Sequence, residues 1–155
     1  MSIEENIPLQ NLRPPQESTA PKQEKGEKLK IKVLLLDDDE AMRMLSALVL
    51  KDMGCSVEEF EDGNKLIEKF KQAKPNEYGL LISDKDMPKS IDGVEVLTAI
   101  HSIDSKLPLI LYTGGLISSQ LEEAVGHLGG VCLQKPFKIE QLQEKVGQAL
   151  SKTRG

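Results

Sequence analysis

The chain has 155 residues and a net charge of -5, with 39% hydrophobic and 29% charged residues. This length suits one domain with a short extension and excludes a large two-domain enzyme. The acidic balance gives no electrostatic basis for binding nucleic acid or an anionic membrane, and no apolar run reaches the roughly 18 residues of a membrane span.

Residues 1–30 differ in composition from the rest of the chain. They hold four of the eight prolines, and their acidic and basic residues balance. Such a segment buries too little apolar surface to offset the entropy lost when it is ordered. We therefore expect a flexible polar tail at 1–30, either inert or serving to tether a partner, followed by one domain at 31–155.

From residue 31 onward, short apolar runs alternate with helical patterns. Five runs begin near residues 32, 56, 79, 108 and 131, and each is too short for a helix. Apolar residues at helical spacing form stripes between and after them, at Met42, Leu45, Leu48 and Val49, at Leu66, Ile67 and Phe70, at Val94, Val96, Leu97 and Ile100, and at Ile139, Leu142, Val146 and Leu150. This repeat predicts an α/β fold, a parallel sheet with helices on both faces.

Capping residues indicate where the predicted helices begin and end. Asp39 can accept hydrogen bonds from the first turn of the first helix, and Gly54 can end that helix. Ser118 or Ser119 begins the fourth helix, with Glu122 placed for a capping box.

Polar residues follow four of the predicted strands at the ends that share one edge of a parallel sheet. Acidic residues follow the first strand at 37–40 and the third at 84–86, whereas Thr113 ends the fourth and Lys135 follows the fifth. Two carboxylates about 4 Å apart repel by roughly 4 kcal/mol at an effective dielectric of 20, so an acidic cluster there indicates a bound cation. Oxygen ligands suit Mg²⁺, and a cation, a carboxylate, a hydroxyl and a lysine together are typical of phosphoryl transfer.

Four segments carry a resemblance to a known family: VLLLDDDEAMR, LLISDKDMP, LILYTGG and LQKPF. In this order, each at a strand end, they resemble the receiver domain of two-component response regulators, the chemotaxis-regulator fold. The resemblance covers nearly everything after the tail. It implies a doubly wound, flavodoxin-like (βα)5 sheet with strand order 2-1-3-4-5, in a stand-alone receiver of a phosphorelay.

The resemblance assigns the acidic residues to a phosphorylation site. Asp84 would be the phospho-acceptor. Asp38 would bind Mg²⁺ directly and Asp37 through water, and Mn²⁺ could replace Mg²⁺. The backbone carbonyl of Asp86 would be a further ligand, so that its side chain need not contact the metal.

The resemblance also assigns the residues that would respond to phosphorylation. Thr113 would donate its hydroxyl to a phosphoryl oxygen, and Lys135 would pair first with Asp84 and then with the phosphoryl group. The changed face would be that of helix four, strand five and helix five, where a downstream partner would bind. The family usually has an aromatic residue three positions before the lysine, but here Cys132 stands there, and Tyr112 is not expected to replace it.

The implied donor is a histidine kinase or a histidine phosphotransfer protein, and the implied function is that of a switch rather than an enzyme. Two alternatives remain. A pseudo-receiver would bind partners without phosphorylation, although such domains lose an acid, the threonine or the lysine, all of which this chain keeps. A haloacid-dehalogenase-type phosphatase also forms an aspartyl phosphate, but its motif needs Thr or Val where Met87 stands.

The remaining reactive side chains are interpreted as structural. Cys55 and Cys132 are far apart and lack metal-ligand spacing, which argues against a disulfide framework and favours a reducing cytoplasm. The chain begins without an apolar secretory segment. His101 and His127 are expected to be surface residues, because no acidic pattern supports them as phospho-histidines.

Overall fold

The computed structural model describes residues 28–154, which form a five-stranded sheet and five helices. The strands are β2 (Lys32–Leu36), β3 (Ser56–Phe60), β4 (Leu80–Asp84), β5 (Leu109–Thr113) and β6 (Gly130–Gln134). The helices are α2 (Glu40–Asp52), α3 (Gly63–Lys71), α4 (Gly93–Ile103), α5 (Ser119–His127) and α6 (Ile139–Arg154). All strand pairs are parallel, in the order β3-β2-β4-β5-β6. This confirms the predicted fold and strand order.

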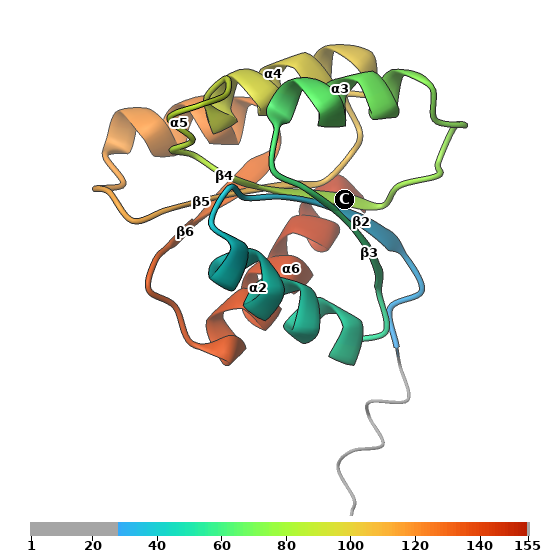
Figure 1. The fold of residues 1–155 in the computed structure, drawn as a ribbon, viewed down its shortest axis with the longest axis horizontal. Coiled ribbons are helices and arrows are strands. Elements are labelled where there is room, and N and C mark those ends of the chain that lie inside the picture. The colour runs from blue at the N-terminus through green and yellow to red at the C-terminus, as the bar shows by residue number, and fades with distance from the viewer. Residues whose placement is uncertain (1–27, 155) are drawn as a thin grey trace, which may run out of the picture.

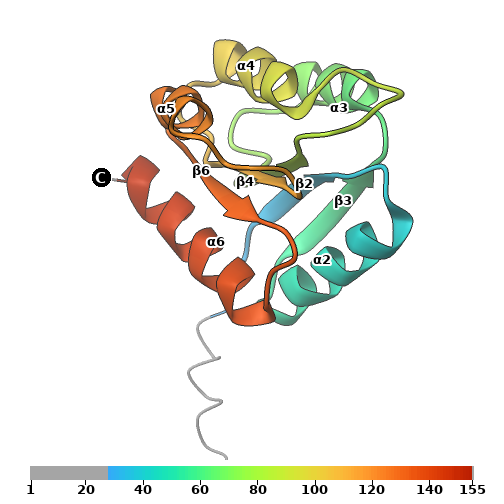
Figure 2. The ribbon, with the colours of Figure 1, turned by 90° about the vertical axis from the view of Figure 1, so that its left-hand side faces the viewer.

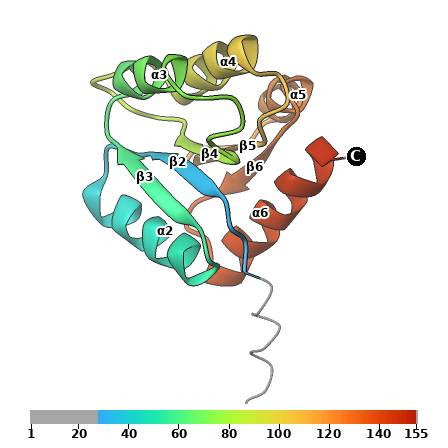
Figure 3. The ribbon, with the colours of Figure 1, turned by 90° about the vertical axis from the view of Figure 1, so that its right-hand side faces the viewer.

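The sheet forms the middle of three layers (Figure 1). Helices α3, α4 and α5 cover one face, and α2 and α6 cover the other. Figure 2 faces the edge strand β6, and Figure 3 faces the opposite edge strand β3. Because both faces are covered, the central strands β4 and β5 are buried at every position, which explains their nearly continuous apolar sequence.

The predicted apolar stripe of α2 is only partly correct: Val49 is buried, whereas Leu45 and Leu48 are exposed. Leu45 is 41% exposed and Leu48 is 64% exposed, and Met44 beside them is 55% exposed. The buried face of the helix consists of Ser46, Ala47, Val49 and Leu50, of which the first two are small. Since apolar residues occur on several sides of this helix, their spacing alone does not select the buried face.

Two helix boundaries follow the predicted signals. Asp39 caps α2 by accepting the N–H groups of Ala41 and Met42 at 3.0 and 3.2 Å. Gly54 follows the end of this helix with φ of +101°, a backbone conformation that favours glycine.

The predicted capping box at α5 is not formed as expected. Ser118 is the cap and accepts the N–H of Leu121 at 3.1 Å, so Glu122 lies one residue beyond the position that a capping box uses. A capping box does form at α4, between Asp92 and Glu95.

The domain begins slightly earlier than the sequence indicated. The backbone N–H of Leu29 donates to the Met53 carbonyl at 2.9 Å, and its side chain packs against the layer between the sheet and helices α2 and α6. Residues 28–30 therefore join the domain, while the rest of the predicted tail, residues 1–27, lies outside the described residues. Among helices at 28–154, none has the length and apolar content needed to cross a membrane.

Candidate functional site

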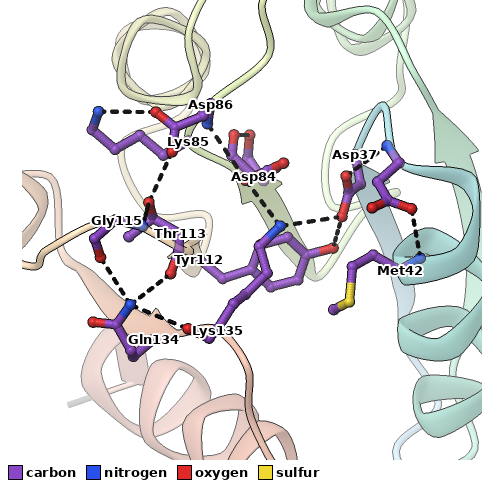
Figure 4. A network of polar contacts seen from close by, with 12 residues as sticks. Asp37, Met42, Asp84, Lys85, Asp86, Tyr112, Thr113, Gly115, Gln134 and Lys135 are labelled. Carbon is purple, nitrogen blue, oxygen red and sulfur yellow. Dashed lines mark hydrogen bonds and ion pairs between the residues drawn. The ribbon is translucent and has the colours of Figure 1, made fainter.

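The strand register aligns polar side chains along one row of the sheet. Asp84, the last residue of β4, lies opposite Tyr112 on β5. Asp37 directly follows β2, whose last residue pairs with the one before Asp84. Neighbours in register project to the same face, so Asp37, Asp84 and Tyr112 all lie on the side covered by α2 and α6. Lys135 directly follows β6 and joins them from the next strand (Figure 4).

Three carboxylates meet at this edge, as the sequence predicted. Asp37, Asp38 and Asp84 each offer an oxygen, and these oxygens lie within 4.8 Å of one another. Asp37 and Asp84 are buried, whereas Asp38 is exposed and open to solvent. Hard oxygen ligands of this kind fit Mg²⁺ or Mn²⁺, and the clustered negative charge favours either ion.

Lys135 is the cation that reaches into this cluster. Its ammonium nitrogen lies 3.3 Å from Asp84 Oδ1 and 4.0 Å from Asp37 Oδ2. Burial, followed by the negative charge of Asp37, nevertheless raises the pKa of Asp84 to about 6, against the opposing effect of Lys135. One ammonium therefore does not compensate the crowded carboxylates, and the site favours a further positive charge.

Thr113 is buried at the end of β5, and its hydroxyl already has a partner. It donates to Asp86 Oδ2 at 2.9 Å and accepts the N–H of Gly115 at 3.0 Å. The other carboxylate oxygen of Asp86 accepts from Lys85 at 3.3 Å. Because a hydroxyl has one proton to donate, Thr113 must leave Asp86 before it can bond a group on Asp84. A metal-ligand role for the Asp86 carbonyl stays a prediction.

Gly93 is a site residue that the sequence analysis did not select. Its N–H donates to the Lys85 carbonyl at 2.9 Å. A Cβ at this position would overlap the Asp84 carbonyl oxygen and approach Lys85 Cα to 2.8 Å. Glycine therefore lets the start of α4 pack directly against the loop that carries Asp84. The Asp-Gly pair that opens the helix was its one signal in the sequence.

Tyr112 is the second residue that the sequence analysis missed. Its buried hydroxyl donates to Asp37 Oδ2 at 2.6 Å, and its ring centroid lies 4.8 Å from the Lys135 nitrogen (Figure 4). Burial, then the charge of Asp37, raises the pKa of Tyr112 well above its usual value. The hydroxyl therefore stays protonated at neutral pH and acts as a donor. Its place directly before Thr113, at the carboxyl end of a predicted strand, was its one signal in the sequence, because its register with Asp84 is visible only in the structure.

A groove of about 420 Å³ lies over β6, between α5 and α6, on the face where the resemblance predicts a partner to bind. Cys132 lies in it and is buried, as predicted, and burial raises the pKa of its thiol. Of the two histidines, His127 is exposed as predicted. His101 is half-buried, contrary to prediction, because it lies near the end of α4 on the partly covered side.

Comparisons with known proteins agree with this geometry. Residues 33–147 match the family model described as response regulator receiver domain. The chain is 29% identical over 126 residues to transcriptional regulatory protein RprY of Bacteroides fragilis, covering 81% of this chain and 52% of that protein. It is 30% identical over 138 residues to transcription factor SKN7 of Saccharomyces cerevisiae, covering 88% of this chain and 21% of that protein. The chain thus spans about half or less of these relatives.

Solved structures show the same fold. The chemotaxis response regulator CheY4 of Vibrio cholerae superposes with a TM-score of 0.67 at 28% identity, covering 79% of this chain and all of that one. A CheY-like receiver domain protein of Methanospirillum hungatei gives 0.70 at 22% identity, covering 81% and 98%. The family match over most of the chain, together with the strand order and the acidic edge, leads to one conclusion: this chain belongs to the response regulator receiver domains of two-component signalling.

Proposed function

We propose that this receiver accepts a phosphoryl group on Asp84 from the phosphohistidine of a histidine kinase or histidine phosphotransfer protein, in a Mg²⁺-dependent reaction. The observation that carries the proposal is the position of Asp84, beside the Lys135 ammonium at 3.3 Å and within the carboxylate cluster. Receiver domains as a family take phosphate from such donors. The modified domain then switches its binding to a downstream partner.

The transfer exchanges one bond for another. A carboxylate oxygen of Asp84 attacks phosphorus, a new P–O bond forms, and the P–N bond of the donor breaks with its electron pair left on the imidazole. Lys135 neutralises charge on the phosphoryl oxygens, and Thr113, once released from Asp86, donates its hydroxyl to one of them. Asp37 and Asp38 would hold Mg²⁺, which when bound would supply further positive charge to the transferring group.

The same residues connect the site to the proposed partner surface. The backbone N–H of Lys135 donates to the Thr113 carbonyl at 2.8 Å, and the Gln134 side chain donates to the Gly115 carbonyl at 2.8 Å. A shift of Thr113 toward Asp84 would therefore be transmitted through these hydrogen bonds to the end of β6. We propose that this movement changes the face of α5, β6 and α6, including the groove over Cys132.

Saturating Mg²⁺ should raise the melting temperature of the protein by several degrees, because an ion that binds only the folded cluster stabilises the folded state. Asp38→Ala removes the exposed ligand and should abolish most of this shift. Asp52→Ala, at an exposed aspartate near the other end of α2, is the control and should keep it. Thermal melts with and without Mg²⁺ measure the effect. Unchanged melting of the wild type would contradict the metal site.

A protein that donates the phosphoryl group must contact the secondary-structure elements around Asp84. Helix α2 is one of these, because it begins directly beside the acidic cluster. Its exposed apolar residues, Met44, Leu45 and Leu48, give such a donor a surface to contact. Burial of these side chains against the donor would bring its phosphohistidine to the site, so we propose α2 as the donor-binding helix.

Leu48→Glu should reduce transfer from a phosphorylated histidine phosphotransfer protein about tenfold or more, since a buried charge at an interface is costly. Labelling by acetyl phosphate, which needs no protein contact, should be unchanged. The matched control is Ile103→Glu, which changes an equally apolar residue, 46% exposed, on α4 across the sheet. Equal losses in both variants, or a loss with acetyl phosphate, would contradict the role of α2.

A further inference from the structure

Two donors fix the orientation of the buried Asp37 carboxylate. Its Oδ1 accepts the backbone N–H of Asp39 at 2.9 Å, and its Oδ2 accepts the Tyr112 hydroxyl at 2.6 Å. A carboxylate bonded at both oxygens has little freedom to rotate. The backbone donor comes from the adjacent loop, whereas the tyrosine reaches it from another strand, 75 positions away in sequence. Tyr112 therefore ties Asp37 to the middle of the sheet.

The ring of Tyr112 lies against the charged side chain of Lys135. The Lys135 nitrogen lies 4.8 Å from the ring centroid, a distance at which a cation is attracted to an aromatic face. The ring is itself stacked on Phe137, with centroids 5.6 Å apart. Lysine is a flexible chain with a strongly hydrated head, so a fixed ring beneath it restricts where its ammonium lies.

These contacts exceed what burial requires. An aliphatic side chain at position 112 would fill the same layer, yet it could neither donate to Asp37 nor attract Lys135. We propose that Tyr112 is a positioning residue of the phosphoryl-accepting site: its hydroxyl orients Asp37 toward a bound cation, and its ring holds the Lys135 ammonium beside Asp84. This inference rests on the proposed function. Tyr112 acts through its neighbours rather than on the phosphoryl group.

Tyr112→Phe removes the hydroxyl and keeps the ring. We expect it to weaken Mg²⁺ binding about tenfold, because partners that orient a metal ligand commonly contribute this much to affinity. The matched control is Tyr78→Phe, which also removes a hydroxyl–carboxylate hydrogen bond, to Glu58 at 2.7 Å. Tyr78 lies just before the first residue of β4, at the end of the strand opposite to Asp84. This variant should therefore bind Mg²⁺ as the wild type does. Titration calorimetry with Mg²⁺ measures both.

The ring contact is tested separately. Tyr112→Leu removes the ring as well as the hydroxyl, and it should weaken Mg²⁺-dependent binding of beryllofluoride at Asp84 further than Tyr112→Phe does. Equal binding of beryllofluoride by the two variants would contradict the role of the ring. Melting of each variant without Mg²⁺ shows that it is folded before binding is compared.

Tyrosine emission gives a direct readout, since the chain has two tyrosines and no tryptophan. In Tyr78→Phe the emission comes from Tyr112 alone, and Mg²⁺ should change it with the midpoint found by calorimetry. In Tyr112→Phe the remaining tyrosine should not respond. Provided that the wild-type protein binds Mg²⁺, two results would overturn the inference. One is an unchanged Mg²⁺ affinity in Tyr112→Phe, and the other is tyrosine emission in Tyr78→Phe that does not change when Mg²⁺ is added. Absence of Mg²⁺ binding and of acetyl phosphate labelling in the wild type would instead overturn the proposed function.

Discussion

Asp84→Asn should abolish phosphorylation of this protein. After incubation with acetyl phosphate and Mg²⁺, the wild type is expected to gain one phosphoryl group, detected by the intact mass. The variant should gain none, because an amide at position 84 lacks the carboxylate nucleophile needed to form an acyl phosphate. The effect is complete, whereas changes at Lys135 or Thr113 remove only charge or hydrogen bonding around the same nucleophile.

Asp86→Asn is the matched control for this experiment. It makes the same chemical change two residues further along the loop, at a side chain that is 58% exposed, and it leaves Thr113 a carbonyl acceptor. We expect it to be labelled. The phosphoryl group should be stable in acid and lost in base, as for an acyl phosphate. Labelling of Asp84→Asn would place the acceptor elsewhere, and an unlabelled wild type would favour a pseudo-receiver that binds without phosphorylation.

The sequence was sufficient to place the strands and helices, because the central strands and the alternation of strand and helix patterns carry strong local signals. Strands β4 and β5 are buried on both faces and therefore show as continuous apolar runs. The acidic cluster was also predictable, since parallel strands place their carboxyl ends along one edge. The strand order came from the family resemblance, because apolar patterns do not specify which strands are neighbours.

The errors arise where several arrangements satisfy the same pattern. Helix α2 has apolar residues on more than one side, so their spacing does not reveal that Ser46 and Ala47 lie on the buried face. The bond from Thr113 to Asp86 depends on which of several nearby acceptors a hydroxyl selects, which residue spacing does not encode. Tyr112 was considered in the sequence only as a replacement for the missing aromatic at position 132, because its contact with Asp37 depends on the combined register of β2, β4 and β5.

Without Mg²⁺, the wild type should lose stability relative to Asp84→Asn as the pH rises from about 4 to 7. The pKa of Asp84 is about 6 in the folded protein, against a reference value of 3.8. Between these values the folded state binds more protons than the unfolded state, so the contribution of Asp84 to stability falls as pH rises. Below this window Asp84 is protonated in both states. Above it both are ionised, and the cost of the buried charge is constant.

The measurement is the difference in melting temperature between Asp84→Asn and the wild type at each pH, because other titrating groups then largely cancel. Each pKa unit corresponds to about 1.4 kcal/mol, so the shift of Asp84 from 3.8 to about 6 should give the variant a gain on the order of 3 kcal/mol, or several degrees, by pH 7. Asp86→Asn, at an exposed side chain, should follow the wild type. Mg²⁺ should reverse the order of the wild type and Asp84→Asn at pH 7, because Asp84→Asn lacks one of the three carboxylates of the cluster. Parallel profiles for Asp84→Asn and the wild type would show that Asp84 carries no unfavourable charge in the folded protein.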